Sequence, residues 1–189
     1  GDIHEMDKFS KMDNPPADHP SSKWYTWRLM NCTKPLIGAI NGLAFGGAAL
    51  MASSFDIRIG TNNTSFKFLA ATYGRLNSSW TLPAQIGWPK AKELLFTGRQ
   101  VMAEEAYEIG LLNHLVTTDK LMDKTLEIAE MISNNDPRMV QGLKKLVSEN
   151  IGHTLKEQYN HEMRAVQDWL KPISVQDSFK TFLDKKGRE

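Results

Sequence analysis

The segment Asn41–Gly47 is the part of the sequence best suited to stabilise a negatively charged oxygen. It contains three glycines and joins an apolar run, residues 36–40, to a run of small apolar residues that begins at Gly47. Glycines let a backbone approach a ligand closely, and amides at a helix start carry partial positive charge. Such amides can hold an oxyanion that forms during a reaction. A glycine-rich turn also occurs for purely structural reasons, so both interpretations stay open on this segment alone.

The sequence lacks the residues typical of nucleotide-binding loops, internal disulfides and zinc sites. No Gly-Lys-Ser/Thr follows the glycines, and their order is not Gly-x-Gly-x-x-Gly, so neither common nucleotide-binding motif is present. The single cysteine, Cys32, cannot form an internal disulfide. With five scattered histidines it suggests no zinc framework, and we expect no metal.

Alternating strands and helices are expected to position the glycine-rich segment, which we predict to be a loop. Apolar runs and period-two alternation predict strands at residues 36–40, 55–60 and 64–68. A helical turn around His4–Met12 and a helix leading to Cys32 come first, and a buried helix starts at Gly47. The expected class is therefore α/β.

Beyond residue 80 the pattern becomes mainly helical. Helices are expected over 90–97, with a stop at Gly98, and over 102–110, followed by a short strand over 111–116. We place a domain boundary there, with a core over 1–116 and a helical region over 117–189. Five apolar residues repeat at helical spacing in that region: Leu155, Tyr159, Met163, Val166 and Leu170.

The composition indicates an ordinary globular protein. The chain has 189 residues, of which 41% are hydrophobic, and 23 basic against 22 acidic residues give a net charge of +1. This balance gives no electrostatic reason to expect nucleic acid or an anionic membrane as a partner. No apolar run is long enough to span a bilayer, and no secretory signal is visible. We expect a cytoplasmic location.

Several segments together resemble the crotonase (enoyl-CoA hydratase/isomerase) superfamily. They occur in the family's order and spacing over nearly the whole chain. The segments are Gly1–Met6, Lys34–Gly47, Asp56–Ile59, Leu82–Gly87, Lys92–Arg99 and Ala103–Asn113.

The resemblance implies a fold and a chemistry. The fold would be a spiral of perpendicular β-strand turns surrounded by helices, with a helical C-terminal region that makes trimers or dimers of trimers. Members bind acyl-CoA thioesters as substrates, need no further cofactor and stabilise an enolate-like anion. By position, the two backbone amides that bind the thioester oxygen are those of Gly1 and Gly47, and Asp2 and Ile3 lie at the coenzyme A site.

The sequence departs from the family at its two catalytic glutamates. Leu50 and Ala70 occupy those positions, and neither side chain can transfer a proton. The following stretch, residues 74–83, also differs and is about three residues shorter by spacing. Hydration by two carboxylates is therefore not expected.

Four polar residues in or next to this altered stretch are candidates to replace the glutamates. Tyr73 could donate a proton, Arg75 could bind an oxyanion or a carboxylate, and Asn77 could orient water. Ser78 completes the group of pocket candidates. The alternatives are that Tyr73 packs in the core, Arg75 forms a salt bridge, and Asn77 and Ser78 satisfy a turn.

Other candidates come from the ends of the chain. His4 follows the first oxyanion amide and could act as an acid or base, or be a surface histidine. Trp24 belongs to an aromatic cluster with Tyr25 and Trp27 that borders the acyl pocket in the family, with core packing as the alternative. Phe179 and Lys186 match a C-terminal helix that meets the coenzyme A nucleotide, or they form an ordinary solvated end.

Three remaining residues are given structural roles. Asp56, at a strand start, is expected to accept a structural hydrogen bond. His153 and His161 are expected at a surface or at a subunit contact. None of the three is expected to take part in catalysis.

Three functions remain open from the sequence. The first is an acyl-CoA-processing lyase or isomerase with an oxyanion hole and atypical catalytic residues. The alternative is a non-catalytic member that binds acyl-CoA, and a purely structural subunit is a third reading. Because the chain opens at the residue matched to the first oxyanion amide, we also expect it to lack roughly 50 to 70 residues of its domain.

Overall fold

A computed structural model describes residues 3–12 and 25–179 of the chain. The chain divides into two compact units, Gly1–Asn135 and Asp136–Glu189, which are described separately. The boundary expected after residue 116 stays a prediction of where the spiral core ends.

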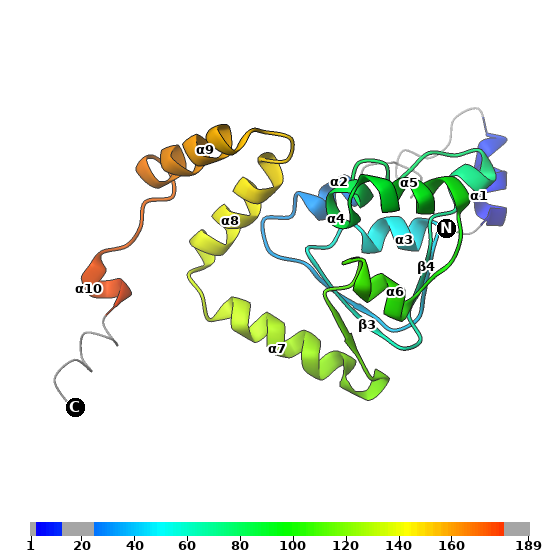
Figure 1. Cartoon of the computed structure of the whole chain (residues 1–189), viewed down its shortest axis with the longest axis horizontal. Coiled ribbons are helices and arrows are strands. Elements are labelled where there is room, and N and C mark those ends of the chain that lie inside the picture. Colours follow the sequence, from blue (N-terminus) through cyan, green and yellow to red (C-terminus); the bar gives the residue numbers. More distant parts are fainter. Residues whose placement is uncertain (1–2, 13–24, 180–189) are drawn as a thin grey trace. The chain divides into compact units, whose positions relative to one another are not determined.

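In the described part of the first unit, six short strands form two three-stranded sheets. Strands β3 and β4, one from each sheet, are labelled in Figure 1. One sheet has the order β1-β3-β6 and is parallel throughout. The other has the order β2-β4-β5, in which β2 and β4 are parallel and β5 is antiparallel to β4. The strands are β1 (Ile37–Ile40), β2 (Leu43–Phe45), β3 (Ile57–Thr61), β4 (Ser65–Lys67), β5 (Val101–Met102) and β6 (His114–Val116).

The strands follow one another as turns of a spiral. The chain leaves β1 for β2 of the other sheet, returns to β3 beside β1, and then enters β4 beside β2. Ile37 is thus paired with Ile57, and Leu43 with Ser65. The expected α/β crotonase-like spiral is confirmed, but the prediction that Asn41–Gly47 is wholly a loop is wrong, because β2 lies within it.

Short helices surround these strands. Met102 ends a strand instead of opening a helix, since it pairs with Ser65 of β4. The stop expected at Gly98 is confirmed by its left-handed φ of 60°. The helices are α1 (Ile3–Ser10), α2 (Tyr25–Met30), α3 (Gly47–Ala52), α4 (Leu82–Ile86), α5 (Trp88–Thr97), α6 (Ala103–Glu108) and α7 (Leu121–Ser133), with 3-10 turns η1 (Ala71–Tyr73) and η2 (Thr118–Lys120).

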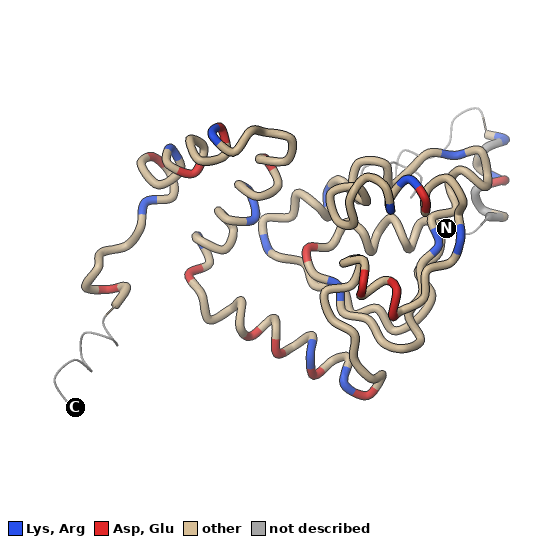
Figure 2. Tube along the Cα trace, viewed as in Figure 1, with Lys and Arg blue, Asp and Glu red and all other residues tan. Residues whose placement is uncertain are grey.

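Two apolar clusters hold the first unit together. Phe66, Phe68 and Leu94 are fully buried in the larger one. In the smaller one, Ile128 of α7 packs with Ile59 of β3. Burial of each large side chain contributes roughly 1.5–3 kcal/mol. Acidic and basic residues also alternate along α7 (Figure 2), and Lys124 forms an ion pair with Glu127 at 2.6 Å.

Asp56 connects the starts of two strands. Its carboxylate accepts a hydrogen bond from the backbone amide of Leu36 at 2.7 Å. Leu36 directly precedes β1 and Asp56 directly precedes β3, so this bond fixes the beginning of their pairing. The structural role expected for Asp56 is confirmed.

The second unit contains α8 (Pro137–Glu149), α9 (Leu155–Gln167) and α10 (Val175–Ser178). The side chain of Asp136 caps α8, and Thr154 with Glu157 forms a capping box at α9. Gly142 of α8 lies directly against the side chain of Leu170, which is buried.

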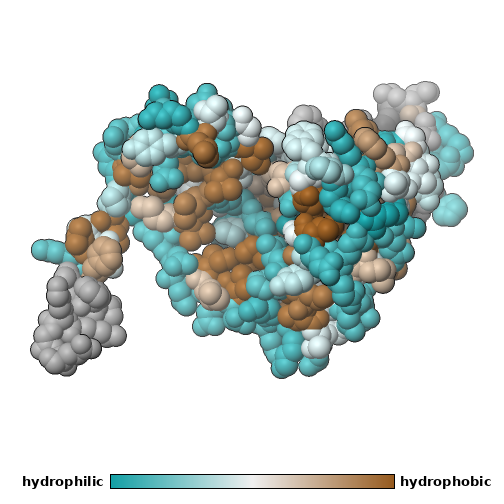
Figure 3. Space-filling view, viewed as in Figure 1, coloured by the Kyte–Doolittle hydropathy of each residue, from teal (hydrophilic) through white to brown (hydrophobic). Residues whose placement is uncertain are grey.

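Apolar side chains are exposed on both units (Figure 3). Along the stripe expected over 155–170, Leu170 is buried, whereas Leu155, Tyr159 and Val166 are exposed. No helix in the described ranges is both long and apolar enough to cross a bilayer.

Candidate active site

The start of α3 is formed by two glycines with different roles. Gly46 has φ of 56° and its amide donates to the carbonyl oxygen of Lys67 at 2.9 Å. This left-handed conformation favours glycine. Gly47 is the first residue of α3, and none of the described side chains caps this helix start. Amides in a first helical turn have no acceptor within the helix, so the Gly47 amide can serve an incoming oxygen.

The chain segment 67–81 is connected to both ends of α3. Lys67 accepts the hydrogen bond from Gly46 at the start of the helix. At its end, the buried hydroxyls of Ser53 and Thr81 lie 3.1 Å apart. Segment 67–81, which contains most of the altered stretch, therefore leaves from the start of α3 and returns to its end.

Leu50 and Ala70, the positions at which the resemblance predicts catalytic glutamates, carry apolar side chains. Leu50 is half-buried on α3, and its carbonyl accepts hydrogen bonds from the hydroxyls of Ser53 and Ser54, both at 2.9 Å. Ala70 is 8% exposed, and its carbonyl accepts bonds from the amides of Tyr73 and Arg75. Neither side chain can transfer a proton, and the pocket roles of both residues stay predictions.

Tyr73 and Arg75 both lie at the surface. Tyr73 is 68% exposed, which excludes the alternative that it packs in the core. Arg75 is also exposed and forms no ion pair within the described part of the chain. Gly74 between them is left-handed, with φ of 63°, and turns the chain. Their catalytic roles stay predictions.

Asn77 and Ser78 hold the turn before α4. Ser78 is fully buried and has φ of 59°, a conformation that no other described non-glycine residue adopts. Its hydroxyl donates to the Asn77 side chain at 3.2 Å, and its carbonyl accepts from the amide of Leu82. A left-handed non-glycine residue costs of order 1–3 kcal/mol and often marks a functional site. These contacts match the structural alternative, and the pocket roles stay predictions.

A buried polar network supports the end of α3. The Gln85 amide nitrogen donates to the Ser53 carbonyl oxygen at 2.5 Å. The Gln85 Oε1 atom is buried and has no hydrogen-bond partner among the described residues. Since Ser53 also contacts Thr81, α3 and α4 are held together by polar groups as well as by packing.

Tyr25 is a site residue that the sequence indicated only as part of a cluster. Its hydroxyl lies 3.5 Å from the Gly47 carbonyl oxygen, to which it donates. Burial raises the pKa of this phenol, which therefore stays protonated at neutral pH. Nearby in the sequence, the ring of Trp27 contacts that of Trp80, with centroids 5.8 Å apart. Nothing in the sequence indicated Trp80 as a site residue except its position within the altered stretch, residues 74–83.

The other predicted site residues are not brought together by the described structure. Ile3 begins α1, and His4 is exposed on that helix. Phe179 is exposed at the end of α10 in the second unit. Gly1, Asp2, Trp24 and Lys186 lie outside the described residues.

The chemistry available at α3 is that of backbone amides and neutral donors. No three His, Cys, Asp or Glu side chains within 3–12 and 25–179 are placed to hold a metal ion. The Gly47 amide can bind an oxyanion, and the Tyr25 hydroxyl can give a proton.

Comparison with known proteins gives consistent results. The sequence profile described as Enoyl-CoA hydratase/isomerase matches residues 1–189. The short-chain-enoyl-CoA hydratase of Clostridium acetobutylicum is 30% identical over 192 residues, which cover 100% of this chain and 73% of that protein. The carnitinyl-CoA dehydratase of Proteus mirabilis is 35% identical over 134 residues, covering 69% of this chain and 51% of that protein.

A solved structure shows the same fold. The crystal structure of an enoyl-CoA hydratase from Bacillus anthracis superposes with a TM-score of 0.78 at 31% identity. The match covers 85% of this chain and 63% of that one. The chain thus spans between about half and three quarters of the length of the relatives named here.

Proposed function

The chain belongs to the enoyl-CoA hydratase/isomerase family, and from that premise we propose that it processes acyl-CoA thioesters as a lyase or isomerase. The observation that carries the proposal is the backbone at Gly46 and Gly47, where a left-handed glycine precedes an uncapped helix start. This is the geometry needed to present an amide to a thioester oxygen.

The reaction would proceed through a thioester enolate. In the proposal, water adds to the β-carbon of an enoyl-CoA while the double-bond electrons move to the thioester oxygen, to which the amides of Gly47 and Gly1 donate. The enolate then takes a proton at its α-carbon from the Tyr25 phenol, and the phenolate takes back the proton that the added water gives up. Donors that are already in position stabilise the enolate charge without reorganising at the moment of reaction. The apolar side chains of Leu50 and Ala70 would exclude further water and strengthen these bonds.

We propose Tyr25 as the proton donor, alongside Tyr73 and Arg75, which the sequence indicated. Tyr25 is favoured because its hydroxyl already contacts the Gly47 backbone and its raised pKa keeps it protonated. A neutral phenol can donate a proton to carbon or to a leaving hydroxyl group. Tyr73, at the surface, would need substrate to cover it.

The remaining parts of the proposal rest on the resemblance. Coenzyme A would be bound as part of the substrate, without a further cofactor, in a cytoplasmic homotrimer or dimer of trimers. The acyl pocket would be lined by His4, Trp24, Leu50, Ala70, Asn77 and Ser78. The coenzyme A part would contact Asp2, Ile3, Phe179 and Lys186.

Turnover of a substrate panel tests the proposal. Purified protein is assayed with enoyl-CoA and 3-hydroxyacyl-CoA thioesters of increasing chain length. We expect Tyr25→Phe to lower kcat/KM by about 100-fold, whereas Tyr107→Phe, an exposed tyrosine on α6, leaves it unchanged. Absence of turnover over the whole panel would contradict the proposal. The non-catalytic alternative, which the enzyme relatives do not favour, predicts binding by calorimetry without turnover.

A further inference from the structure

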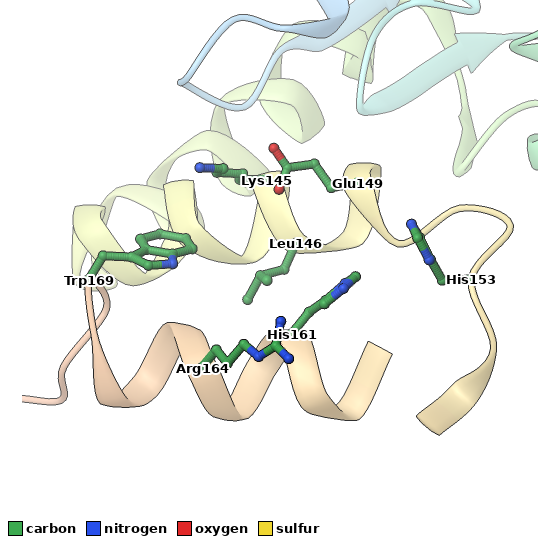
Figure 4. Close-up of a pocket in the computed structure, with 7 residues that line it drawn as sticks. All are labelled: Lys145, Leu146, Glu149, His153, His161, Arg164 and Trp169. Atoms are coloured by element: carbon green, nitrogen blue, oxygen red, sulfur yellow. The ribbon is translucent and has the colours of Figure 1, made fainter. Parts of the chain in front are cut away.

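A pocket of about 380 Å³ lies between α8 and α9 in the second unit (Figure 4). Figure 4 shows Trp169 at one end of it and His153 at the other, with His161 and Arg164 extending from α9 toward α8. Leu146 of α8 points into the space between the two helices. The proposed reaction uses none of these residues.

The charges around the pocket favour an anion. Lys145 and Arg164 are cations, and Glu149 is the one carboxylate in its lining. In the described part of this unit, the Arg164 guanidinium has no carboxylate partner. Its planar set of donors matches the geometry of a phosphate group, which it can bind through two parallel hydrogen bonds.

His161 lines the pocket from α9. Its Nδ1 atom lies 2.7 Å from the Asn150 side-chain oxygen, which can only accept, so Nδ1 carries the proton. This bond fixes the orientation of the ring, which forms one wall of the pocket. The His153 ring meets the His161 ring edge-on, with centroids 5.0 Å apart, and restricts its rotation.

Trp169 and Leu146 give the pocket an apolar part. The Trp169 ring is half-exposed, and the Lys145 ammonium lies 4.7 Å from its centroid. This cation–π contact holds the lysine at the same end of the pocket as the indole. An aromatic group of a ligand could therefore contact the indole while its charge stays near the lysine.

We propose that this pocket binds an aromatic phosphate monoester. Arg164 and Lys145 bind the phosphate, and Trp169 with Leu146 contacts the ring. The volume is in the range of small-ligand sites. The proposal concerns binding alone and does not depend on the acyl-CoA chemistry of the first unit.

Calorimetry with three probes tests it on the purified protein, with no acyl-CoA present. We expect phenyl phosphate to bind saturably, inorganic phosphate to bind more weakly, and phenol to give no measurable heat. Arg164→Gln should weaken phenyl phosphate binding about tenfold, the loss of one charged hydrogen-bonding group. Arg138→Gln is the matched control, because Arg138 pairs with Asp136 at the start of α8 and does not line the pocket.

A second variant separates the two parts of the site. Trp169→Leu should weaken phenyl phosphate binding more than inorganic phosphate binding, because only phenyl phosphate also loses the contact of its ring with the indole. Circular dichroism confirms that each variant keeps its helices. Unsaturable heats for phenyl phosphate, or equal affinities for Arg164→Gln and Arg138→Gln, would overturn the proposal while leaving the proposed reaction untouched.

Discussion

The Nε atom of Arg58 donates a hydrogen bond to the carbonyl oxygen of Leu111 at 2.6 Å. A second bond of the same length runs from its Nη1 atom to the Phe55 carbonyl oxygen. Arg58 is 4% exposed, and burial lowers its pKa to about 10, so it remains charged at neutral pH. This buried cation connects β3 to the segment before β6, far along the chain.

Replacing this arginine should destabilise the first unit. We expect Arg58→Ala to lower the free energy of unfolding by about 3 kcal/mol, because buried carbonyl groups lose their charged donor. Urea unfolding measures the change. The control is Arg138→Ala at the surface, which should cost less than about 1 kcal/mol. Equal effects of the two variants would show that the buried contacts contribute little.

The ion pair of Arg99 with Glu105 should contribute to the free energy of unfolding at neutral pH and lose this contribution in acid. Arg99 donates to both carboxylate oxygens of Glu105, at 2.8 and 2.5 Å, and thereby lowers the pKa of Glu105. A lowered carboxylate pKa gives stability that is present above the usual pKa near 4.5 and lost as the pH falls below it. We expect Glu105→Gln to cost about 1 kcal/mol at pH 7, since the pair is partly exposed.

The same variant should lose part of the acid dependence. Melting temperatures of Glu105→Gln and of the unchanged protein should converge as the pH approaches 3. Glu104→Gln, an exposed neighbour on α6, is the control and should leave the curve unchanged. A constant difference from pH 7 to pH 3 would contradict the assignment.

Because Ser78 is left-handed, glycine should be tolerated at this position better than valine. We expect Ser78→Gly to change stability by less than about 1 kcal/mol, because glycine relieves the backbone while the hydroxyl contact is lost. Ser78→Val should cost about 2 kcal/mol or more, because a β-branched residue is strained at φ of 59°. Thermal unfolding compares them with Ser79→Val at the exposed neighbour. A harmless Ser78→Val would mean that this turn adjusts freely.

Helix interiors usually favour alanine over glycine, but position 142 should favour glycine. Glycine-to-alanine changes in exposed helix interiors stabilise by about 1 kcal/mol. A Cβ at position 142, however, would overlap the Leu170 side chain, so we expect Gly142→Ala to destabilise the second unit by about 2 kcal/mol. Hydrogen exchange of the α8 amides reports this change. Gln141→Ala is the exposed control, and adding Leu170→Ala should recover part of the loss if the overlap is its cause.

A glutamate introduced at position 50 should test whether an added carboxylate increases the hydration rate. We expect Leu50→Glu to raise the hydration rate of an enoyl-CoA about tenfold, part of the effect of a positioned acid/base group. Steady-state kinetics measures it against Met51→Glu, an exposed neighbour on α3. A similar gain from Met51→Glu would show that any added negative charge suffices.

Much of the fold could be predicted because local rules decide it. The strand beginning near residue 36 and the helix stop at Gly98 depend on nearby residues. The acceptor role of Asp56 followed instead from the resemblance, because its partner Leu36 lies 20 residues away. A Cβ at Gly98 would also meet the Thr72 hydroxyl at 2.6 Å, so packing and backbone conformation favour the same residue. These are positions where local and tertiary preferences agree.

The features that escaped prediction depend on distant contacts. Strand β2 is three residues long and exists because it pairs with β4, which no local pattern signals. Ser78 has an ordinary residue type in a left-handed turn. In the aromatic cluster, it is Tyr25 that meets Gly47, and one position along a helix changes the direction of a side chain by about 100°. The roles of Gly47, Leu50 and Ala70 stay predictions taken from the resemblance.

The bond between the Gly46 amide and the Lys67 carbonyl has an evolutionary consequence. Both partners are backbone atoms, so no side-chain replacement removes either of them, provided that position 46 stays a glycine. The frame around α3 is therefore independent of the side chains that it displays. Residues 50 and 70 can each change type without removing this bond, so the helix start keeps its place. Substitutions at these positions can change the chemistry of the site while its backbone stays the same.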